Sequence, residues 1–124
     1  MSATYLLDST ILIDHLNGVA KATEWLSALQ PEEAKLSVMT RAEVLTKAGD
    51  QWEAVTALLD EYSCLPIGPD EADLAAGIRN RYHMNLPDAF QAVLAQEEEL
   101  ILVTRDADDF KDVENLTVKI PYRI

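Results

Sequence analysis

Four acidic side chains stand where the sequence predicts the end of a strand or the first turn of the helix that follows. They are Asp8, Glu43, Asp88 and Asp106. Because the C-terminal ends of parallel strands lie on one edge of a sheet, we expect these carboxylates to converge there. Carboxylates that lie so close take up protons unless a cation neutralises them. Oxygen ligands without cysteine or histidine favour Mg²⁺, with Mn²⁺ as the alternative, over Zn²⁺.

Each of these acids also has a purely structural explanation. Thr40 and Glu43 have the spacing of a capping box, in which the glutamate accepts a hydrogen bond from a backbone N–H at the helix start. Asp88 in a first turn interacts favourably with the helix dipole, and Asp106 also suits a turn or an N-cap. Asp8 fits a structural role least well, because it ends an apolar run in which a carboxylate should cost stability.

The elements that position these acids follow from the hydrophobic pattern. Strands are predicted over residues 5–7, 35–39, 65–67, 100–103 and 117–120. Helices are predicted over residues 9–19, 23–29, 40–48, 52–62, 71–82 and 87–96, with Pro87 as the first residue of the last one.

The order of these elements defines a fold class. Strands alternate with helices along the whole chain, which predicts an α/β fold with three α/β/α layers and a mostly parallel central sheet of about five strands. The run Leu100–Val103 is entirely apolar and is expected at the centre of the sheet. Pro66 places the 65–67 strand at an edge or in a late position. We expect a single domain spanning residues 1–124.

Composition narrows the functional classes. The 124 residues are 48% apolar, which is sufficient for a core without disulfides, and Cys64 is the only cysteine. Twenty-two acids against 10 Lys and Arg residues give a net charge of −12, which by itself counts against binding to nucleic acid. No apolar run is long enough to cross a membrane, and Asp8 interrupts the position of a signal sequence, so we expect a cytoplasmic protein with no membrane partner.

The acidic motifs, in this order and spacing, resemble those of the PIN-domain ribonucleases. The likeness is to the small toxin nucleases of VapBC-type toxin–antitoxin pairs in particular. The matching segments are YLLDSTILID (5–14), TRAEVL (40–45), LPDAFQAVLA (86–95), LVTRDADDF (102–110) and VKIPY (118–122). Together they cover nearly the whole chain.

The resemblance implies roles for particular residues. The implied metal-binding carboxylates are Asp8, Glu43, Asp88 and Asp106. The hydroxyls of Ser9 and Thr104 would lie beside them and contact the substrate. Many members of the family carry asparagine where Asp106 stands and aspartate where Asp109 stands, so Asp109 is the alternative ligand at the fourth position.

The reaction expected from such a site is Mg²⁺-dependent hydrolysis of RNA phosphodiester bonds by an endoribonuclease. Four of the arginines lie near the acidic motifs: Arg41, Arg79, Arg81 and Arg105. They either bind RNA phosphates beside the metal, with Arg79 and Arg81 as the first candidates, or neutralise the acids and form ordinary surface pairs.

The resemblance also implies a cognate antitoxin protein as partner, and we expect a homodimer. Trp25, Trp52 and Tyr62 either furnish a dimer or partner surface or belong to the core. A competing interpretation is a catalytically inert PIN scaffold that binds metal or protein without cutting RNA. An inert scaffold should have lost one or more of the acids, and this sequence retains all four.

Overall fold

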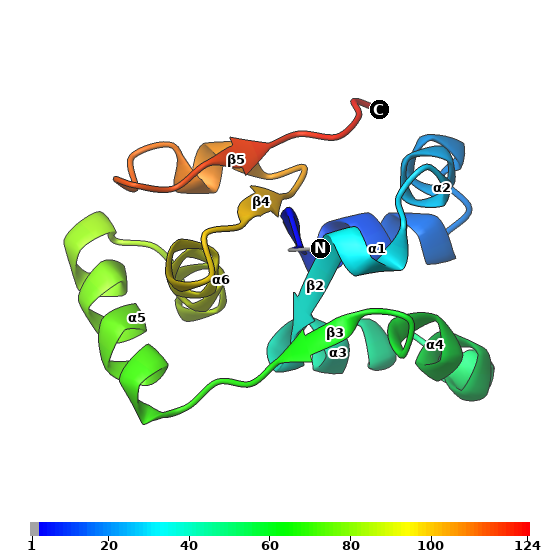
Figure 1. Ribbon diagram of the computed structural model, residues 1–124, viewed down its shortest axis with the longest axis horizontal. Helices are drawn as coiled ribbons and strands as arrows, with labels where there is room; N and C mark the ends of the chain where they lie inside the picture. The colour runs from blue at the N-terminus through cyan, green and yellow to red at the C-terminus, as the bar shows by residue number, and fades with distance from the viewer. Residues whose placement is uncertain (1–2) are drawn as a thin grey trace.

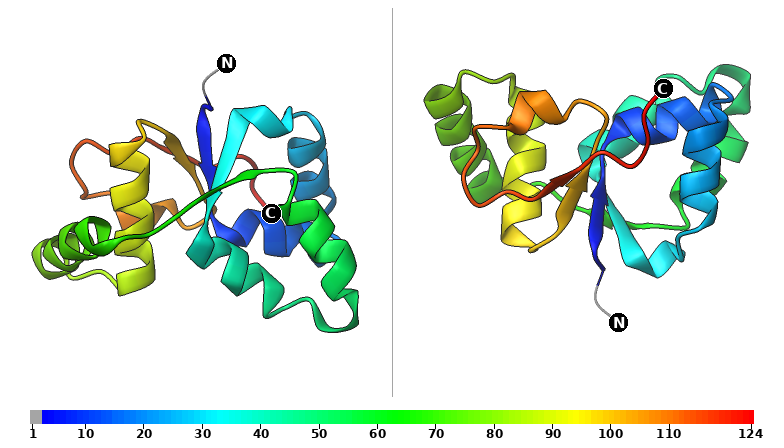
Figure 2. Two further views of the ribbon diagram at one scale, coloured as in Figure 1. Left: turned by 60° about the horizontal axis from the view of Figure 1, so that its bottom comes forward. Right: turned by 90° about the horizontal axis from the view of Figure 1, so that it is seen from above.

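The computed structural model describes residues 3–124 and contains a five-stranded sheet with helices on both faces (Figure 1, Figure 2). The strands are β1 (Tyr5–Leu7), β2 (Ala34–Ser37), β3 (Ser63–Leu65), β4 (Ile101–Val103) and β5 (Val118–Lys119). Their order is β3-β2-β1-β4-β5, and every pairing is parallel. The predicted three-layer α/β/α architecture is therefore confirmed.

Helices connect the first four strands and cover both faces of the sheet. The α-helices are α1 (Ser9–Leu16), α2 (Ala20–Ser27), α3 (Val38–Leu45), α4 (Trp52–Leu59), α5 (Pro69–Tyr82) and α6 (Leu86–Glu97). Short 3₁₀ segments are η1 (Pro31–Glu33), η2 (Gly49–Gln51) and η3 (Ala107–Phe110). Helices α1 to α4 lie on one side of the sheet, and α5, α6 and η3 lie on the other (Figure 2).

Alternation along the strands divides the core between the two faces. Leu7 and Val103 pack with the apolar side chains of α1 to α4. Leu6 and Leu102, their neighbours in sequence, pack instead with α6 and with Phe110 of η3. This is the period of two expected for strands that are buried on both faces. The sheet edge that carries the C-terminal strand ends is thus held rigidly by two cores.

The boundary between β2 and α3 differs from the sequence prediction. The strand ends at Ser37, and Val38 and Met39 belong to α3 rather than to the strand. The Ser37 hydroxyl accepts a hydrogen bond from the Thr40 backbone N–H at 2.9 Å and so caps the helix. The capping-box interpretation of Thr40 and Glu43 is therefore wrong. Glu43 lies in the second turn of α3 and is free of any capping function.

Ser37→Ala is expected to lower the free energy of unfolding by about 1 kcal/mol, because it removes this cap from a helix start where Ser37 and Thr40 are fully buried. Urea denaturation of both proteins measures the difference. Ser27→Ala is the matched control, since the Ser27 hydroxyl is exposed and bonds only to the carbonyl of Thr23 in its own helix. Equal losses in the two variants would contradict the capping role.

Two helix starts also differ from the sequence prediction. Helix α6 begins at Leu86, so Pro87 is its second residue, and Asn85 caps it by accepting the Asp88 N–H at 2.9 Å. Helix α5 begins at Pro69, and Glu71 accepts the Gly68 N–H at 2.8 Å. In both cases a side chain satisfies a free N–H near the helix start.

The predicted strand at 65–67 is displaced to Ser63–Leu65, but it lies at the sheet edge as Pro66 indicated. The all-apolar 100–103 segment supplies an interior strand, β4, although the middle position belongs to β1.

The aromatic residues considered for a partner surface divide between core and solvent. Trp25 and Tyr62 are partly buried and pack against the core cluster that contains Leu7. Trp52 is 55% exposed and does not belong to the core. Within residues 3–124, no helix is long and apolar enough to cross a membrane.

Candidate metal site

A cavity of about 300 Å³ opens beyond the C-terminal ends of the central strands. Its lining, which we call the acid cavity, consists of Asp8, Ser9, Thr10, Glu43, Asn85, Pro87, Asp88, Gln91, Asp106 and Asp109. Five of these ten residues are carboxylates: Asp8 follows β1, Glu43 lies on α3, Asp88 lies on α6, Asp106 follows β4 and Asp109 lies in η3. The convergence expected from parallel strands is therefore present, and it includes both candidates for the fourth position, Asp106 and Asp109.

Asp8 is the most firmly held of these acids. It is 8% exposed and follows β1, and its backbone N–H donates to the Val103 carbonyl at 2.9 Å. One carboxylate oxygen, Oδ2, accepts from the hydroxyls of Thr104 at 2.7 Å and Thr10 at 3.3 Å. The other, Oδ1, accepts from Gln91 Nε2 at 3.2 Å. These donors compensate the burial of the charge and fix the direction of the carboxylate.

Gln91 is a residue that the sequence reasoning missed. It is 2% exposed, and its Nε2 also donates to the Thr40 hydroxyl at 2.9 Å, which links α6 to the capped start of α3. Its Oε1 is buried and has no hydrogen-bond partner among residues 3–124. The opposite amide orientation would bring Oε1 against the Asp8 carboxylate, so Nε2 is the atom that faces Asp8. The sequence signal for this role is a glutamine at a position within the apolar stripe of α6.

The carboxylates in the cavity disfavour one another's ionisation. Burial, followed by the charges of Asp8 and Asp109, raises the pKa of Asp88 to about 6, against a partly opposing hydrogen bond from Asn85. Burial and the charge of Asp8 also raise the pKa of Glu43. A cluster of this kind gains stability from any cation that neutralises it.

Asp88→Asn is expected to stabilise the metal-free protein at pH 7 by about 1–2 kcal/mol, a value already reduced for solvent screening. A carboxyl whose folded pKa lies near 6 rather than at 3.8 contributes stability below pH 3.8 and loses it as the pH rises through 6. The increase in the free energy of unfolding of the variant over wild type should therefore be near zero at pH 4 and complete at pH 7. Thermal unfolding in EDTA across this pH range measures it. A gain that is the same at every pH would rule out the charge effect.

The donor set fits a hard divalent cation. All the charged groups of the cavity are carboxylates, and the unpaired Gln91 Oε1 adds a buried acceptor at its wall. Within residues 3–124, however, no three His, Cys, Asp or Glu side chains already stand in the arrangement of a metal site. The carboxylates therefore line one cavity, but no three of them are arranged to bind the same cation.

The remaining predicted site residues occupy different places. Ser9 lines the cavity, whereas Thr104 is fully buried beneath it and acts on Asp8. None of the four arginines named above lines the cavity. Arg41 pairs with Asp60 at 2.9 Å, and Arg79 is exposed on α5.

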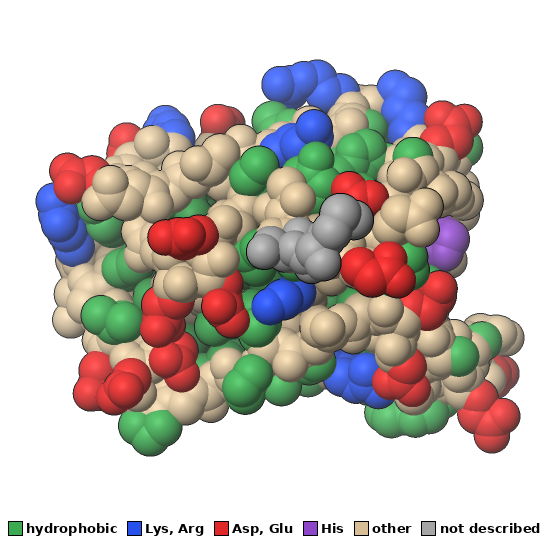
Figure 3. Space-filling model, in the orientation of Figure 1, with side chains coloured by type: hydrophobic (Ala, Val, Ile, Leu, Met, Phe, Trp, Pro, Cys, Tyr) green, Lys and Arg blue, Asp and Glu red, His purple; other side chains and the backbone are tan. Residues whose placement is uncertain are grey.

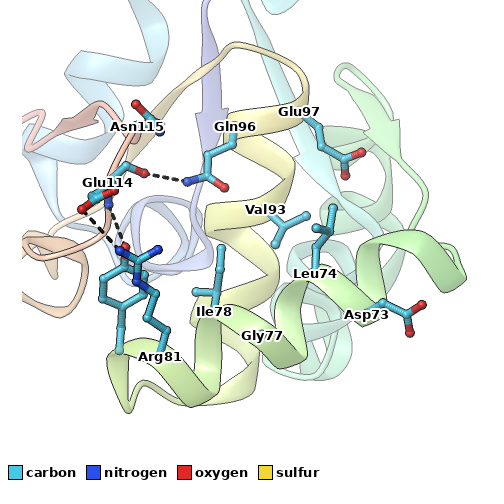
Figure 4. A pocket seen from close by; sticks show the side chains of 11 residues that line it. Asp73, Leu74, Gly77, Ile78, Arg81, Val93, Gln96, Glu97, Glu114 and Asn115 are labelled. Atoms are coloured by element: carbon cyan, nitrogen blue, oxygen red, sulfur yellow. Dashed lines mark hydrogen bonds and ion pairs between the residues drawn. The ribbon is translucent and has the colours of Figure 1, made fainter.

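Arg81 lies at a second, larger pocket of about 390 Å³ between α5, α6 and the segment after η3 (Figure 4). It pairs with Glu114 at 3.4 Å and lies over the Tyr82 ring. Ile78, Leu74 and Val93 line this pocket, while its acids, Asp73, Glu97 and Glu114, are spread around the periphery (Figure 4). The pocket therefore lacks the converging carboxylates of the acid cavity, which remains the candidate site.

Fold and cavity together define a class of parallel α/β proteins with a carboxylate cluster beyond the C-terminal ends of the strands. Within that class, the chain belongs to the PIN domain family, whose model matches residues 5–116.

The solved structures that the chain resembles agree with this assignment. A toxin–antitoxin complex from Klebsiella pneumoniae contains a chain with 32% identity and a TM-score of 0.86, and the match covers 98% of this chain and 100% of that one. FitAcB from Neisseria gonorrhoeae matches with 23% identity and a TM-score of 0.82, over 98% of this chain and 100% of that one. VapBC-1 from nontypeable Haemophilus influenzae matches with 20% identity and a TM-score of 0.75, over 95% and 98%. No curated protein sequence matches the chain.

Proposed function

We propose that this protein is a Mg²⁺-dependent endoribonuclease and the toxin of a toxin–antitoxin pair. The observation that carries the proposal is the convergence of five carboxylates on one cavity at the C-terminal sheet edge. PIN domains are generally nucleases that use divalent metal ions. The resemblance over 98% of the chain to a chain from a toxin–antitoxin complex supports an antitoxin as partner.

The residues of the cavity would have two kinds of role, binding the cation and positioning the residues that bind it. Asp8 and Asp88 would hold the cation directly, and Glu43 together with Asp106 or Asp109 would complete the set of carboxylates. A divalent cation, when bound, activates a water molecule and stabilises the negative charge that develops on the phosphate. Gln91 and Thr104 hold Asp8 in one orientation, so the ligand does not have to be ordered during the reaction.

RNA must approach a protein with a net charge of −12. Acidic side chains are spread over the face in Figure 3, and several Lys and Arg side chains lie along its upper edge, near β5 and the C-terminal segment. A pocket of about 280 Å³ there shares Asp106 and Asp109 with the acid cavity and is also lined by Arg123. We therefore add Arg123 to the candidates for phosphate contact.

Incubation with single-stranded RNA and transfer RNA in Mg²⁺, Mn²⁺ or EDTA tests the proposal. Internal cleavage that depends on either metal is the expected result, with products resolved by gel electrophoresis. Cleavage that persists in EDTA would rule out the metal mechanism. No cleavage of any RNA in the panel would favour the inert PIN scaffold.

A further inference from the structure

Asp14, which the acid cavity does not include, is a buried carboxylate with three donors. It is 6% exposed and lies on α1. Arg105 contacts it through two guanidinium nitrogens, Nε to Oδ2 and Nη2 to Oδ1, the latter at 3.1 Å. The Tyr122 hydroxyl donates to Oδ2 at 2.7 Å. We call Asp14, Arg105 and Tyr122 the Asp14 cluster.

The Asp14 cluster joins three segments that are distant in sequence. Asp14 belongs to α1, Arg105 to the turn between β4 and η3, and Tyr122 to the C-terminal segment after β5. This last segment runs toward α1 and α2 (Figure 1, Figure 2), where its Arg123 carbonyl accepts from Lys21 Nζ at 2.6 Å. A bidentate, charged contact to a buried carboxylate has a defined geometry, unlike a pair that is solvated on both sides.

Arg105 stands between two residues that belong to the metal site. On one side, the Thr104 hydroxyl donates to Asp8. On the other, the Asp106 backbone N–H donates to that same hydroxyl at 3.1 Å, and the Asp106 side chain lines the acid cavity. The Arg105 backbone N–H also lies 3.5 Å from the Thr10 hydroxyl. Thr10 and Asp14 are one helical turn apart, so Arg105 contacts α1 at two successive turns.

We propose that Asp14 and Tyr122 hold Arg105 as a positioning residue that fixes Asp106 in the acid cavity. The inference rests on the proposed metal-binding role of that cavity. In this proposal the main role of Arg105 is to position Asp106 and not to contact RNA, because two of its guanidinium nitrogens already donate to Asp14. It also gives the C-terminal segment a part in the site, although no residue of that segment lines the acid cavity among residues 3–124.

The first measurement uses Mn²⁺ binding to the full chain without RNA, by calorimetry. Asp14→Asn and Arg105→Gln should each weaken the Mn²⁺ affinity about 10-fold, the lower end of the effect of removing a group that orients a metal ligand. The double variant should be no weaker than either single one, because both changes break the same contact. Tyr122→Phe should give a smaller loss in the same direction. The matched control is Glu114→Gln, which breaks the exposed pair with Arg81 and should leave the affinity unchanged.

The second measurement does not depend on metal. Amide hydrogen exchange of Asp106 in the metal-free protein should be faster in Asp14→Asn and Tyr122→Phe than in wild type, and unchanged in Glu114→Gln. If cleavage is observed, Asp14→Asn should lower kcat and leave the KM for RNA unchanged.

Two results would overturn the inference. One is a rate of amide hydrogen exchange at Asp106 in folded Asp14→Asn that equals the wild-type rate. The other is a change confined to the KM for RNA in Arg105→Gln, as the loss of a phosphate contact would give. Failure of the proposed function gives a different pattern. In that case Mn²⁺ does not bind to wild type, or binds equally well to Asp8→Asn, while the exchange experiment still decides on the Asp14 cluster.

Discussion

Asp8→Asn is expected to lower the rate of metal-dependent RNA cleavage by at least about 100-fold, because it removes the most firmly held of the carboxylates that we propose as metal ligands. The amide has the shape of the carboxylate but accepts at one oxygen only. Its NH₂ group would face either the Gln91 Nε2 donor or the hydroxyls of Thr104 and Thr10, so no orientation satisfies every partner. Single-turnover cleavage at saturating Mg²⁺ measures the effect on the chemical step.

The variant should remain folded, since the change removes a buried negative charge without changing the volume of the side chain. Thermal unfolding followed by circular dichroism checks this point. Asp60→Asn is the matched control, because Asp60 is exposed and pairs with Arg41 outside the acid cavity. A folded Asp8→Asn protein that cleaves RNA at the wild-type rate would show that the acid cavity is not the catalytic site.

Phe110→Ala is expected to lower the free energy of unfolding by about 3–5 kcal/mol, as for other large-to-small changes in a close-packed core. Phe110 is 2% exposed and is the last residue of η3. It packs with Leu6 of β1 and Leu102 of β4 on one face of the sheet. Removing the ring leaves a void under the segment that carries Asp106 and Asp109. Urea denaturation measures the loss.

Ile124→Ala is the control for this change, since Ile124 is 76% exposed and its truncation should alter stability by less than about 0.5 kcal/mol. Amide exchange in the η3 segment should rise in Phe110→Ala beyond the increase in the rest of the chain. A loss below about 1 kcal/mol would mean that η3 collapses onto the void and that its position is not set by Phe110.

Local pattern in the sequence was sufficient for the fold class. Alternating strands and helices predicted the parallel sheet, and Pro66 correctly predicted an edge strand. The misplaced boundaries have a local cause, since the structure begins helices at capping side chains. Ser37 and Asn85 accept backbone N–H groups at the starts of α3 and α6, and such residues are equally compatible with a strand end or a loop.

The pattern failed for side chains whose role depends on a distant partner. The sequence leaves Trp52 open between core and surface, and the structure exposes it by 55%, because periodicity identifies a helix face but not what covers it. Cys64 is exposed on the edge strand β3, although cysteine is among the residue types most often buried. For the arginines the sequence leaves phosphate contacts and ordinary ion pairs both open, and the structure pairs Arg41, Arg81 and Arg105 with Asp60, Glu114 and Asp14.

The sequence by itself determined which acids could meet. The carboxylates follow strands or open helices, and a parallel sheet brings all such positions to one edge. Only the tertiary structure decided how they are held. Gln91 reaches Asp8 across 83 residues and Arg105 reaches Asp14 across 91. Contacts at such separations depend on the packing of whole elements, and no local periodicity encodes them.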